Sequence, residues 1–233
     1  MDIELCSGST MLKISTNGGY VTGLSDEFGD ILFPKQTLMT TDGAEKTRGG
    51  LHVCLPNFGP GGASGLGQHG YGRTNEWVIR NQSETSVELV LAGVGEYMGM
   101  ESCLTYEVLE RGFMTQLRLK NGGDLPLKVA PAFHPYWCLD GKAPEVNGVY
   151  HDDLAKFSEA QFISGDTVRL KLASRDLVLK SDELNQWAQW TDQLGDYLCI
   201  EPSQSGFSFG EDISRADILG AGEELKYSFT VTW

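Results

Sequence analysis

The sequence predicts an all-β fold, a large antiparallel β-sandwich formed by a single domain over residues 1–233. Three observations lead to this prediction. Short segments alternate between apolar and polar residues, turn residues separate these segments, and helical periodicity is nearly absent. With 40% hydrophobic residues among 233, the chain is long enough to bury a sizeable core. No proline- and serine-rich linker and no internal repeat divides it.

The strongest strand predictions come from period-two alternation. Residues 102–109 and 113–119 alternate in this way, and the intervening residues 110–112 are typical of a hairpin turn. Residues 224–233 alternate up to the final tryptophan. Shorter runs of the same kind predict further strands at 86–91, 168–172, 176–180 and 197–201. Many short strands joined by turns are typical of an antiparallel sandwich or barrel.

Asparagine and glycine mark the turns at 17–19, 121–123 and 147–148, because both residue types tolerate a positive φ angle. The single helical expectation is a two-turn segment over 153–160. The glycine-rich segment 59–67 predicts a flexible loop at the rim of a site. It lacks the Gly-Lys-Ser/Thr ending of a phosphate-binding loop and precedes no convincing helix, so it gives little support to a nucleotide site.

The composition excludes several classes of function. The 18 Lys and Arg residues against 32 Asp and Glu give a net charge of −14, so we expect neither nucleic acid nor an anionic membrane as a partner. One phosphorylated small molecule in a local cationic pocket stays compatible with this charge. No apolar run of about 20 residues predicts a membrane span. The first residues do not have the pattern of a signal peptide, so we expect a cytoplasmic protein.

The cysteines and histidines do not form a recognisable metal or disulfide pattern. The five cysteines are scattered, odd in number and without a CxxC motif, so we expect reduced thiols. The four histidines form no H-x-H or HExxH pair, and we expect no metal and no cofactor.

Two segments carry a histidine in a context suited to chemistry. His69 and Arg73 lie between glycines, where the backbone can approach a ligand closely; the alternative is a tight turn with two solvated side chains. His134 precedes Pro135, which favours an extended conformation at the histidine. Its aromatic neighbours suit either stacking on a sugar or packing in the core.

A third segment ends an apolar strand with Glu201, just before Pro202. Burial would raise the pKa of this carboxyl toward values useful for a general base. The alternative is a glutamate exposed at the end of a strand. An imidazole and a carboxylate, each next to a proline, suggest an acid/base pair for a small polar substrate.

Together, five short segments resemble motifs of the galactose mutarotase-like family, that is, aldose 1-epimerases and hexose-6-phosphate 1-epimerase-like proteins. In the family's order they are 48–59 (R-G-G-x-P-x-x-x-P-x-F-G), 69–73 with Trp77 (H-G-F-A-R and a tryptophan), 133–137 (H-P-Y-F or H-T-Y-F), 199–202 (C-v-E-P) and 219–223 (L-x-P-G-E). His52 stands where relatives usually have proline, and the chain is shorter than most of them. We therefore expect the exit of this strand to differ and the loops around the site to be shorter, and the motifs leave the choice of substrate open.

The resemblance implies a galactose mutarotase-like supersandwich with a sugar bound in a groove across one sheet. It implies that Glu201 is the general base and His134 the general acid. These two groups would interconvert the α and β anomers of an aldose, or of an aldose 6-phosphate, by opening and reclosing the ring. No metal or redox cofactor takes part in this chemistry.

The resemblance also implies residues that bind the sugar. His69, Arg73 and Arg48 would contact ring hydroxyls or an anionic substituent, and Asp152, or equally Asp153, would contact the sugar. Two other functions remain open. One is a sugar-binding protein with the same fold and no turnover. The other is a glycoside hydrolase, which usually needs two carboxylates, whereas only one has a distinctive context here.

Overall fold

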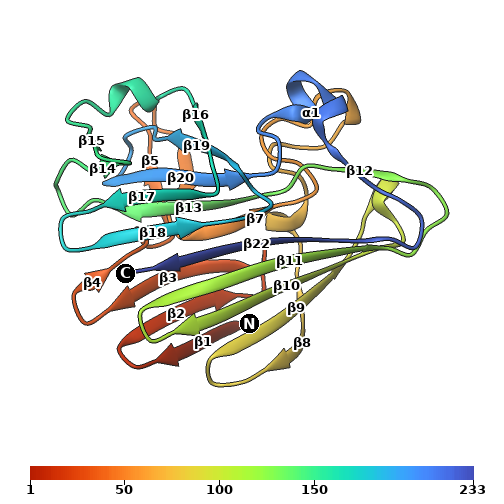
Figure 1. Ribbon diagram of the computed structural model, residues 1–233, viewed down its shortest axis with the longest axis horizontal. Coiled ribbons are helices and arrows are strands. Elements are labelled where there is room, and N and C mark those ends of the chain that lie inside the picture. The colour runs from red at the N-terminus through yellow and green to blue at the C-terminus, as the bar shows by residue number, and fades with distance from the viewer.

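Two nine-stranded antiparallel sheets make up most of the structure, a computed structural model that describes all residues from Met1 to Trp233 (Figure 1). In spatial order, the first sheet contains β1 (Asp2–Ser7), β2 (Thr10–Ser15), β3 (Tyr20–Asp26) with β4 (Gly29–Asp30) beside it, β7 (Leu51–Cys54), β13 (Ala132–Cys138), β20 (Tyr197–Ser203), β19 (Gln186–Trp190) and β16 (Gln161–Ser164). The second contains β15 (Val149–Tyr150), β14 (Glu145–Val146), β17 (Thr167–Lys171), β18 (Asp176–Lys180), β22 (Glu224–Thr232), β11 (Gly112–Asn121), β10 (Met100–Leu109), β9 (Ser86–Ala92) and β8 (Val78–Gln82). The predicted all-β sandwich is confirmed.

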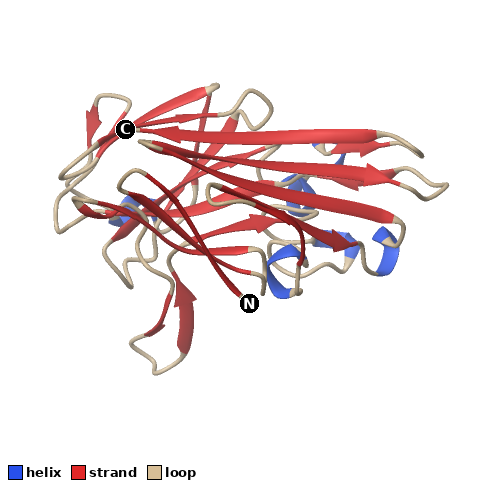
Figure 2. Ribbon diagram, turned by 90° about the horizontal axis from the view of Figure 1, so that it is seen from below, coloured by secondary structure: helices blue, strands red, loops and turns tan.

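Short elements complete the fold, and Figure 2 shows that strands dominate it. The two-stranded sheets pair β5 (Gln36–Met39) with β6 (Glu45–Arg48) and β12 (Leu127–Val129) with β21 (Asp217–Leu219). The helical turns are η1 (Gly62–Ser64), η2 (Gly72–Thr74), η3 (Gly95–Tyr97), η4 (Ala155–Phe157), α1 (Ser208–Glu211) and η5 (Ile213–Arg215). None of these helices is long and apolar enough to cross a membrane.

Each segment predicted as a strand from its alternation forms one, namely β9, β10, β11, β17, β18, β20 and β22. The predicted hairpin is also present. β10 and β11 stay in register up to the pair Leu109↔Gly112, which leaves Glu110 and Arg111 as the turn. Alternation is a reliable signal in β10 and β11 because one face of each strand is buried and the other is more accessible to water.

The helical prediction over 153–160 is wrong, because only η4 forms in this segment. The Asp153 carboxylate accepts a hydrogen bond from the backbone N–H of Ala155 at 2.9 Å. Such a local side-chain contact offers the backbone an alternative to helical bonding. The chain then enters β16 at Gln161, so no second turn can follow.

The core lies between the two sheets and is centred on aromatic rings. Phe229 of β22 lies 5.9 Å from Phe113 of β11, measured between ring centroids. From the opposite sheet, Phe133, Trp137 and Trp187 approach the same ring to between 6.0 and 6.5 Å. Each of these side chains is at most 1% exposed. The rings thus join β13 and β19 of the first sheet to β11 and β22 of the second.

One buried ion pair also joins the sheets. Arg175 precedes β18, and its guanidinium binds the carboxylate of Asp26 at the end of β3, with 2% and 4% of the two side chains exposed. The guanidinium also donates hydrogen bonds to the carbonyl oxygens of Gly29 and Asp30. These contacts satisfy a charge that would be costly to bury alone.

Replacing Arg175 by methionine should therefore lower the free energy of unfolding by about 3 kcal/mol, because Asp26 would lose its partner in a buried position. The measurement is urea-induced unfolding of Arg175→Met beside the wild type. The matched control is Arg215→Met, since Arg215 pairs with Glu211 at the surface. It should change the free energy by less than about 0.5 kcal/mol. Equal effects of the two substitutions would contradict the assigned importance of the buried pair.

Candidate active site

His134 and Glu201 lie opposite each other on adjacent strands of the first sheet. Ladder pairs on both sides fix the register of β13 and β20, namely Ala132↔Ser203 and Tyr136↔Cys199. Since successive side chains of a strand point to opposite faces, His134 and Tyr136 share a face with Cys199 and Glu201. The intervening residues on both strands point to the other face, into the core described above.

The flanking strands extend this face. On β7, His52 is the ladder partner of His134, and the two imidazoles stack with their centroids 4.7 Å apart. On β19, Trp190 is the ladder partner of Cys199, and its ring lies 6.0 Å from that of His134. Four neighbouring strands therefore place imidazole, carboxyl, thiol and aromatic groups side by side.

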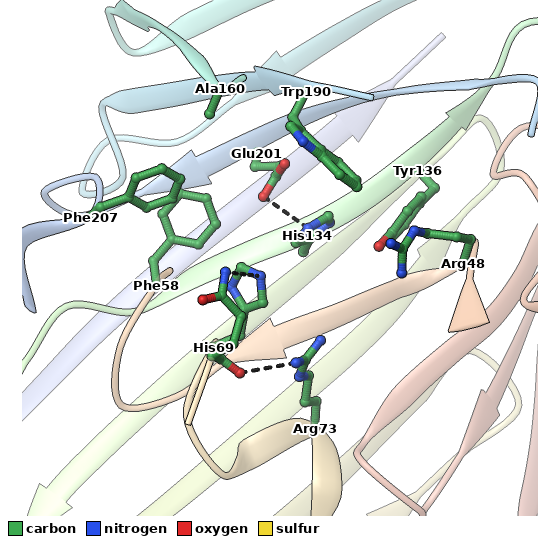
Figure 3. Close-up of a pocket in the computed structure, with 11 residues that line it drawn as sticks. Arg48, Phe58, His69, Arg73, His134, Tyr136, Ala160, Trp190, Glu201 and Phe207 are labelled. Atoms are coloured by element: carbon green, nitrogen blue, oxygen red, sulfur yellow. Dashed lines mark hydrogen bonds and ion pairs between the residues drawn. The ribbon is translucent and has the colours of Figure 1, made fainter. Parts of the chain in front are cut away.

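A pocket of about 280 Å³ opens on this face. In Figure 3, His134 and Glu201 point toward each other at its centre, Phe58 and Phe207 lie on one side, and Tyr136 and Arg48 lie on the other. The lining residues are Arg48, Phe58, Gln68, His69, Arg73, His134, Tyr136, Ala160, Trp190, Glu201 and Phe207. Aromatic walls with a few convergent polar groups are typical of small-molecule sites.

The imidazole and the carboxyl form a buried pair. Nε2 of His134 lies 3.3 Å from Oε2 of Glu201, and the residues are 4% and 2% exposed. Burial raises the pKa of Glu201 well above its usual range. Burial lowers the pKa of His134, and the charges of His69, Arg73 and Arg48 add to this effect. Apart from their mutual contact, Oε2 of Glu201 and Nδ1 of His134 have no hydrogen-bond partner, although both atoms are buried.

His69 is held at the pocket by the loop that follows β7. Its Nδ1 accepts a hydrogen bond from the backbone N–H of Gly59 at 3.2 Å, which leaves the proton of the neutral ring on Nε2. Burial, with the charges of Arg73 and Arg48, lowers the pKa of His69 to about 3. Gly70 has a φ of +66°, and a side chain there would meet the carbonyl oxygen of Leu55. A glycine is therefore required beside this histidine.

The two arginines of the pocket differ in how their charge is compensated. Arg48 donates from Nε and from its terminal nitrogen to Asp192, at 2.8 and 2.7 Å, and lies 5.5 Å from the Trp190 ring. The hydroxyl of Tyr197 donates to the same aspartate. Arg73 donates to the carbonyl oxygen of Gln68 at 3.0 Å and has no carboxylate partner. Arg73 is therefore the arginine whose charge remains available to an anion.

A sequence model of the aldose 1-epimerase family matches residues 1–194. The chain belongs to this family. The match ends before β20, so Glu201 lies outside the matched residues. No curated protein sequence matches the chain significantly.

Solved structures resemble this aldose 1-epimerase family member over its whole length. A galactose mutarotase-like protein from Lactobacillus casei superposes with a TM-score of 0.83 at 12% identity, covering 100% of this chain and 99% of that one. A protein from Synechocystis gives 0.81 at 18% identity, covering 100% and 95%. A galactose mutarotase related enzyme from Lactobacillus acidophilus gives 0.80 at 15%, covering 100% and 97%. At such identities the likeness concerns the fold.

Five of the six predicted site residues come together in the pocket of this family member: Arg48, His69, Arg73, His134 and Glu201. Asp152 does not join them. It is exposed and follows β15, at the edge of the second sheet, whereas the pocket lies on the first. The alternative, Asp153, caps the backbone at Ala155. The distance of either aspartate from the site cannot be predicted from the sequence, because it depends on how the two sheets pack.

Several residues of the site have no recognisable signal in the sequence. Asp192 neutralises Arg48 across 144 positions of sequence, and no local pattern signals such a pair. Trp190 and Phe207 line the pocket from β19 and from the segment before α1. Alternation along β19 places Trp190 on the same face as Ala188, but only the strand order shows that this face carries the site.

Proposed function

We propose that this protein is an aldose 1-epimerase that interconverts the α and β anomers of a sugar, with Glu201 as general base and His134 as general acid. One observation carries the proposal: a buried carboxyl and a buried imidazole lie 3.3 Å apart in the lining of a pocket with aromatic walls. Membership of the aldose 1-epimerase family supports it independently.

The reaction needs two coordinated proton transfers. Glu201 accepts the proton of the anomeric hydroxyl while His134 donates a proton to the ring oxygen. The bond between C1 and the ring oxygen breaks, and C1 becomes an aldehyde carbon. Rotation about the C1–C2 bond presents the other face of the carbonyl. Reclosure reverses both transfers, so the pair regains its starting protonation state after each turnover.

The shared proton of the pair must lie on the imidazole when the reaction starts. In the free protein, burial favours the neutral form of each partner, because it raises the pKa of the carboxyl and lowers that of the imidazole. A bound sugar would donate hydroxyl hydrogen bonds to the Glu201 carboxylate. Hydrogen bonds to the charged form stabilise it, so substrate binding would move the proton to His134.

The other lining groups would orient the sugar. His69 would offer its Nε2 to a ring hydroxyl, in place of the Gln68 side-chain amide that lies 3.3 Å from it, since its Nδ1 already accepts from the backbone. Trp190 and Phe58 offer apolar surfaces for the C–H faces of a sugar ring. Glu201 is the only carboxylate among the lining residues. The pocket therefore gives less support to glycoside hydrolysis, which uses two carboxylates in most families.

Glu201→Gln and His134→Ala should each slow anomerisation by at least about 100-fold, the lower end of the usual contribution of a general acid or base. The measurement is polarimetry or exchange NMR on freshly dissolved α-glucose and α-glucose 6-phosphate. Glu107→Gln and His151→Ala are matched controls, because these residues lie outside the pocket lining.

Unchanged rates in both site variants would refute the acid/base roles. Sugar binding by the wild type without any acceleration would instead identify a sugar-binding protein.

The substrate class is the second part of the proposal, and we infer that it is a phosphorylated aldose. A neighbouring cavity of about 400 Å³ shares Arg73 and Tyr136 with the pocket. It also contains Lys35, whose ammonium lies 3.8 Å from the centroid of the Tyr20 ring and forms no ion pair. None of its lining residues is acidic. Two uncompensated cations beside a sugar pocket suit a phosphate group.

The residues that we propose to bind the phosphate differ in part from those expected from the sequence. Arg48 and Arg73 are the arginines that the family resemblance assigns to an anionic substituent, whereas the charge of Arg48 is already balanced by Asp192. Lys35 replaces Arg48 as the second cation. A further polar group of this cavity is His52, which is 1% exposed and has no partner on either ring nitrogen.

Lys35→Met should therefore lower the ratio of kcat/KM for glucose 6-phosphate to kcat/KM for glucose by about tenfold, the value of one lost charge-assisted hydrogen bond. Lys13→Met, on the exposed side of β2, is the control and should leave this ratio unchanged. Steady-state polarimetry with both sugars measures it. Equal efficiency of the wild type with the two sugars would contradict the inferred substrate class.

A further inference from the structure

The sheet face under the pocket gathers three side chains that can bind a metal ion. His134, Cys199 and Glu201 each offer one ligand atom, these atoms all lie within 4.8 Å of one another, and all three residues are buried. They supply one nitrogen, one sulfur and one oxygen. Zinc accepts each of these ligand types, and its catalytic sites often have three protein ligands and one open position.

The backbone positions the three ligands before any ion arrives. Cys199 and Glu201 are two residues apart on β20 and therefore share a face. The register of β13 places His134 opposite Glu201 and next to Cys199. All three belong to adjacent central strands of a nine-stranded sheet, rather than to a loop. Little backbone ordering would be required on binding, which favours affinity.

The three ligand atoms would have to move only slightly closer together to bind a zinc ion. With bonds of about 2.0 to 2.3 Å, the ligands of a tetrahedral zinc ion lie about 3.5 Å apart. Closing from 4.8 Å is a movement of roughly 1 Å, within reach of side-chain torsions. The 3.3 Å contact between His134 and Glu201 would be lost, and Oε2 of Glu201 and Nδ1 of His134 have no other hydrogen-bond partner to lose. His134 and Glu201 line the pocket, whereas Cys199 is fully buried and does not, and the pocket leaves room for a fourth ligand.

The charge and softness of the ligands indicate which ion would bind. A thiolate and a carboxylate together carry two negative charges, which a divalent cation balances in a buried site. Binding would release the thiol proton, and that of the carboxyl where it is present, to solvent. Sulfur and imidazole ligands favour Zn²⁺ over Mg²⁺ and Ca²⁺, which prefer oxygen.

We propose that His134, Cys199 and Glu201 form a Zn²⁺-binding site, and that the bound ion blocks the epimerase by occupying the acid/base pair. Metal binding stands on the geometry alone, whereas inhibition rests on the proposed function. The two parts therefore need separate readouts.

Binding is tested on the whole, chelator-treated protein with Zn²⁺ by calorimetry and with Co²⁺ by absorption spectroscopy. We expect one Zn²⁺ per chain, no detectable Mg²⁺ binding, and a sulfur-to-cobalt charge-transfer band. Cys199→Ser should remove the band and weaken Zn²⁺ binding by at least about 100-fold, since loss of a supporting outer group alone costs about 10- to 100-fold. Circular dichroism and thermal unfolding check that the variant is folded, and Cys199→Ala provides a second variant.

Cys54→Ser is the matched control. Cys54 is also fully buried, lies on the adjacent strand β7, and approaches Nδ1 of His69 at 3.3 Å, but it does not belong to the three-ligand group. Retention of the band in Cys54→Ser supports the proposed site. A band that survives in both folded Cys199 variants, or is lost only in Cys54→Ser, would overturn it, and so would the absence of stoichiometric binding.

Inhibition is measured by polarimetry with and without Zn²⁺. Reversal by chelator, together with relief in Cys199→Ser, is the expected result. Zn²⁺ binding without any effect on a measurable epimerase rate would overturn the second part of the proposal. Binding by a chain with no epimerase activity would leave the metal site standing and refute the proposed function instead.

Discussion

The alternation of side chains along two central strands, β13 and β20, is the constraint on which the rest of the structure depends. One face of these strands supplies Phe133 and Trp137 to the aromatic core around Phe229. The other face presents His134 and Glu201 to the pocket. A shift of either strand by one residue would exchange the two faces and destroy both. Core packing and site geometry are thus specified by the same backbone register.

Much of the fold can be predicted from the sequence, because apolar and polar residues alternate clearly in strands with one buried face. β10, β11 and β22 are examples, and the turn between the first two is equally clear. β20 is different, since both of its faces are buried and its alternation does not reveal which one carries the site. The resemblance to the family implies that His134 and Glu201 act together, and the two side chains lie 3.3 Å apart. Partnerships across long sequence distances, such as that of Asp192 with Arg48, depend on sheet order and leave no local signal.

The positions of four cationic side chains show which anions this chain, with its net charge of −14, can still bind. The charges of Arg175 and Arg48 are each balanced by an aspartate. Arg175 joins the two sheets, and Arg48 joins the end of β6 to the segment that follows β19. Arg73 and Lys35 have no carboxylate partner, and both line the cavity next to the pocket. A net negative charge combined with a small cationic site disfavours polyanions while leaving one anionic group free to bind.

The position of β22 has a consequence for folding. This strand lies in the middle of the second sheet, between β18 and β11, yet it is formed by residues 224–232. Until it is in place, the sheet exists as two separate ladders, and β11 exposes an unpaired edge. During synthesis on the ribosome, the aromatic ring of Phe229 arrives after nearly all of its packing partners. The second sheet can therefore close only after residues 224–232 have been synthesised, and until then the edges of β18 and β11 are open to pairing with other chains.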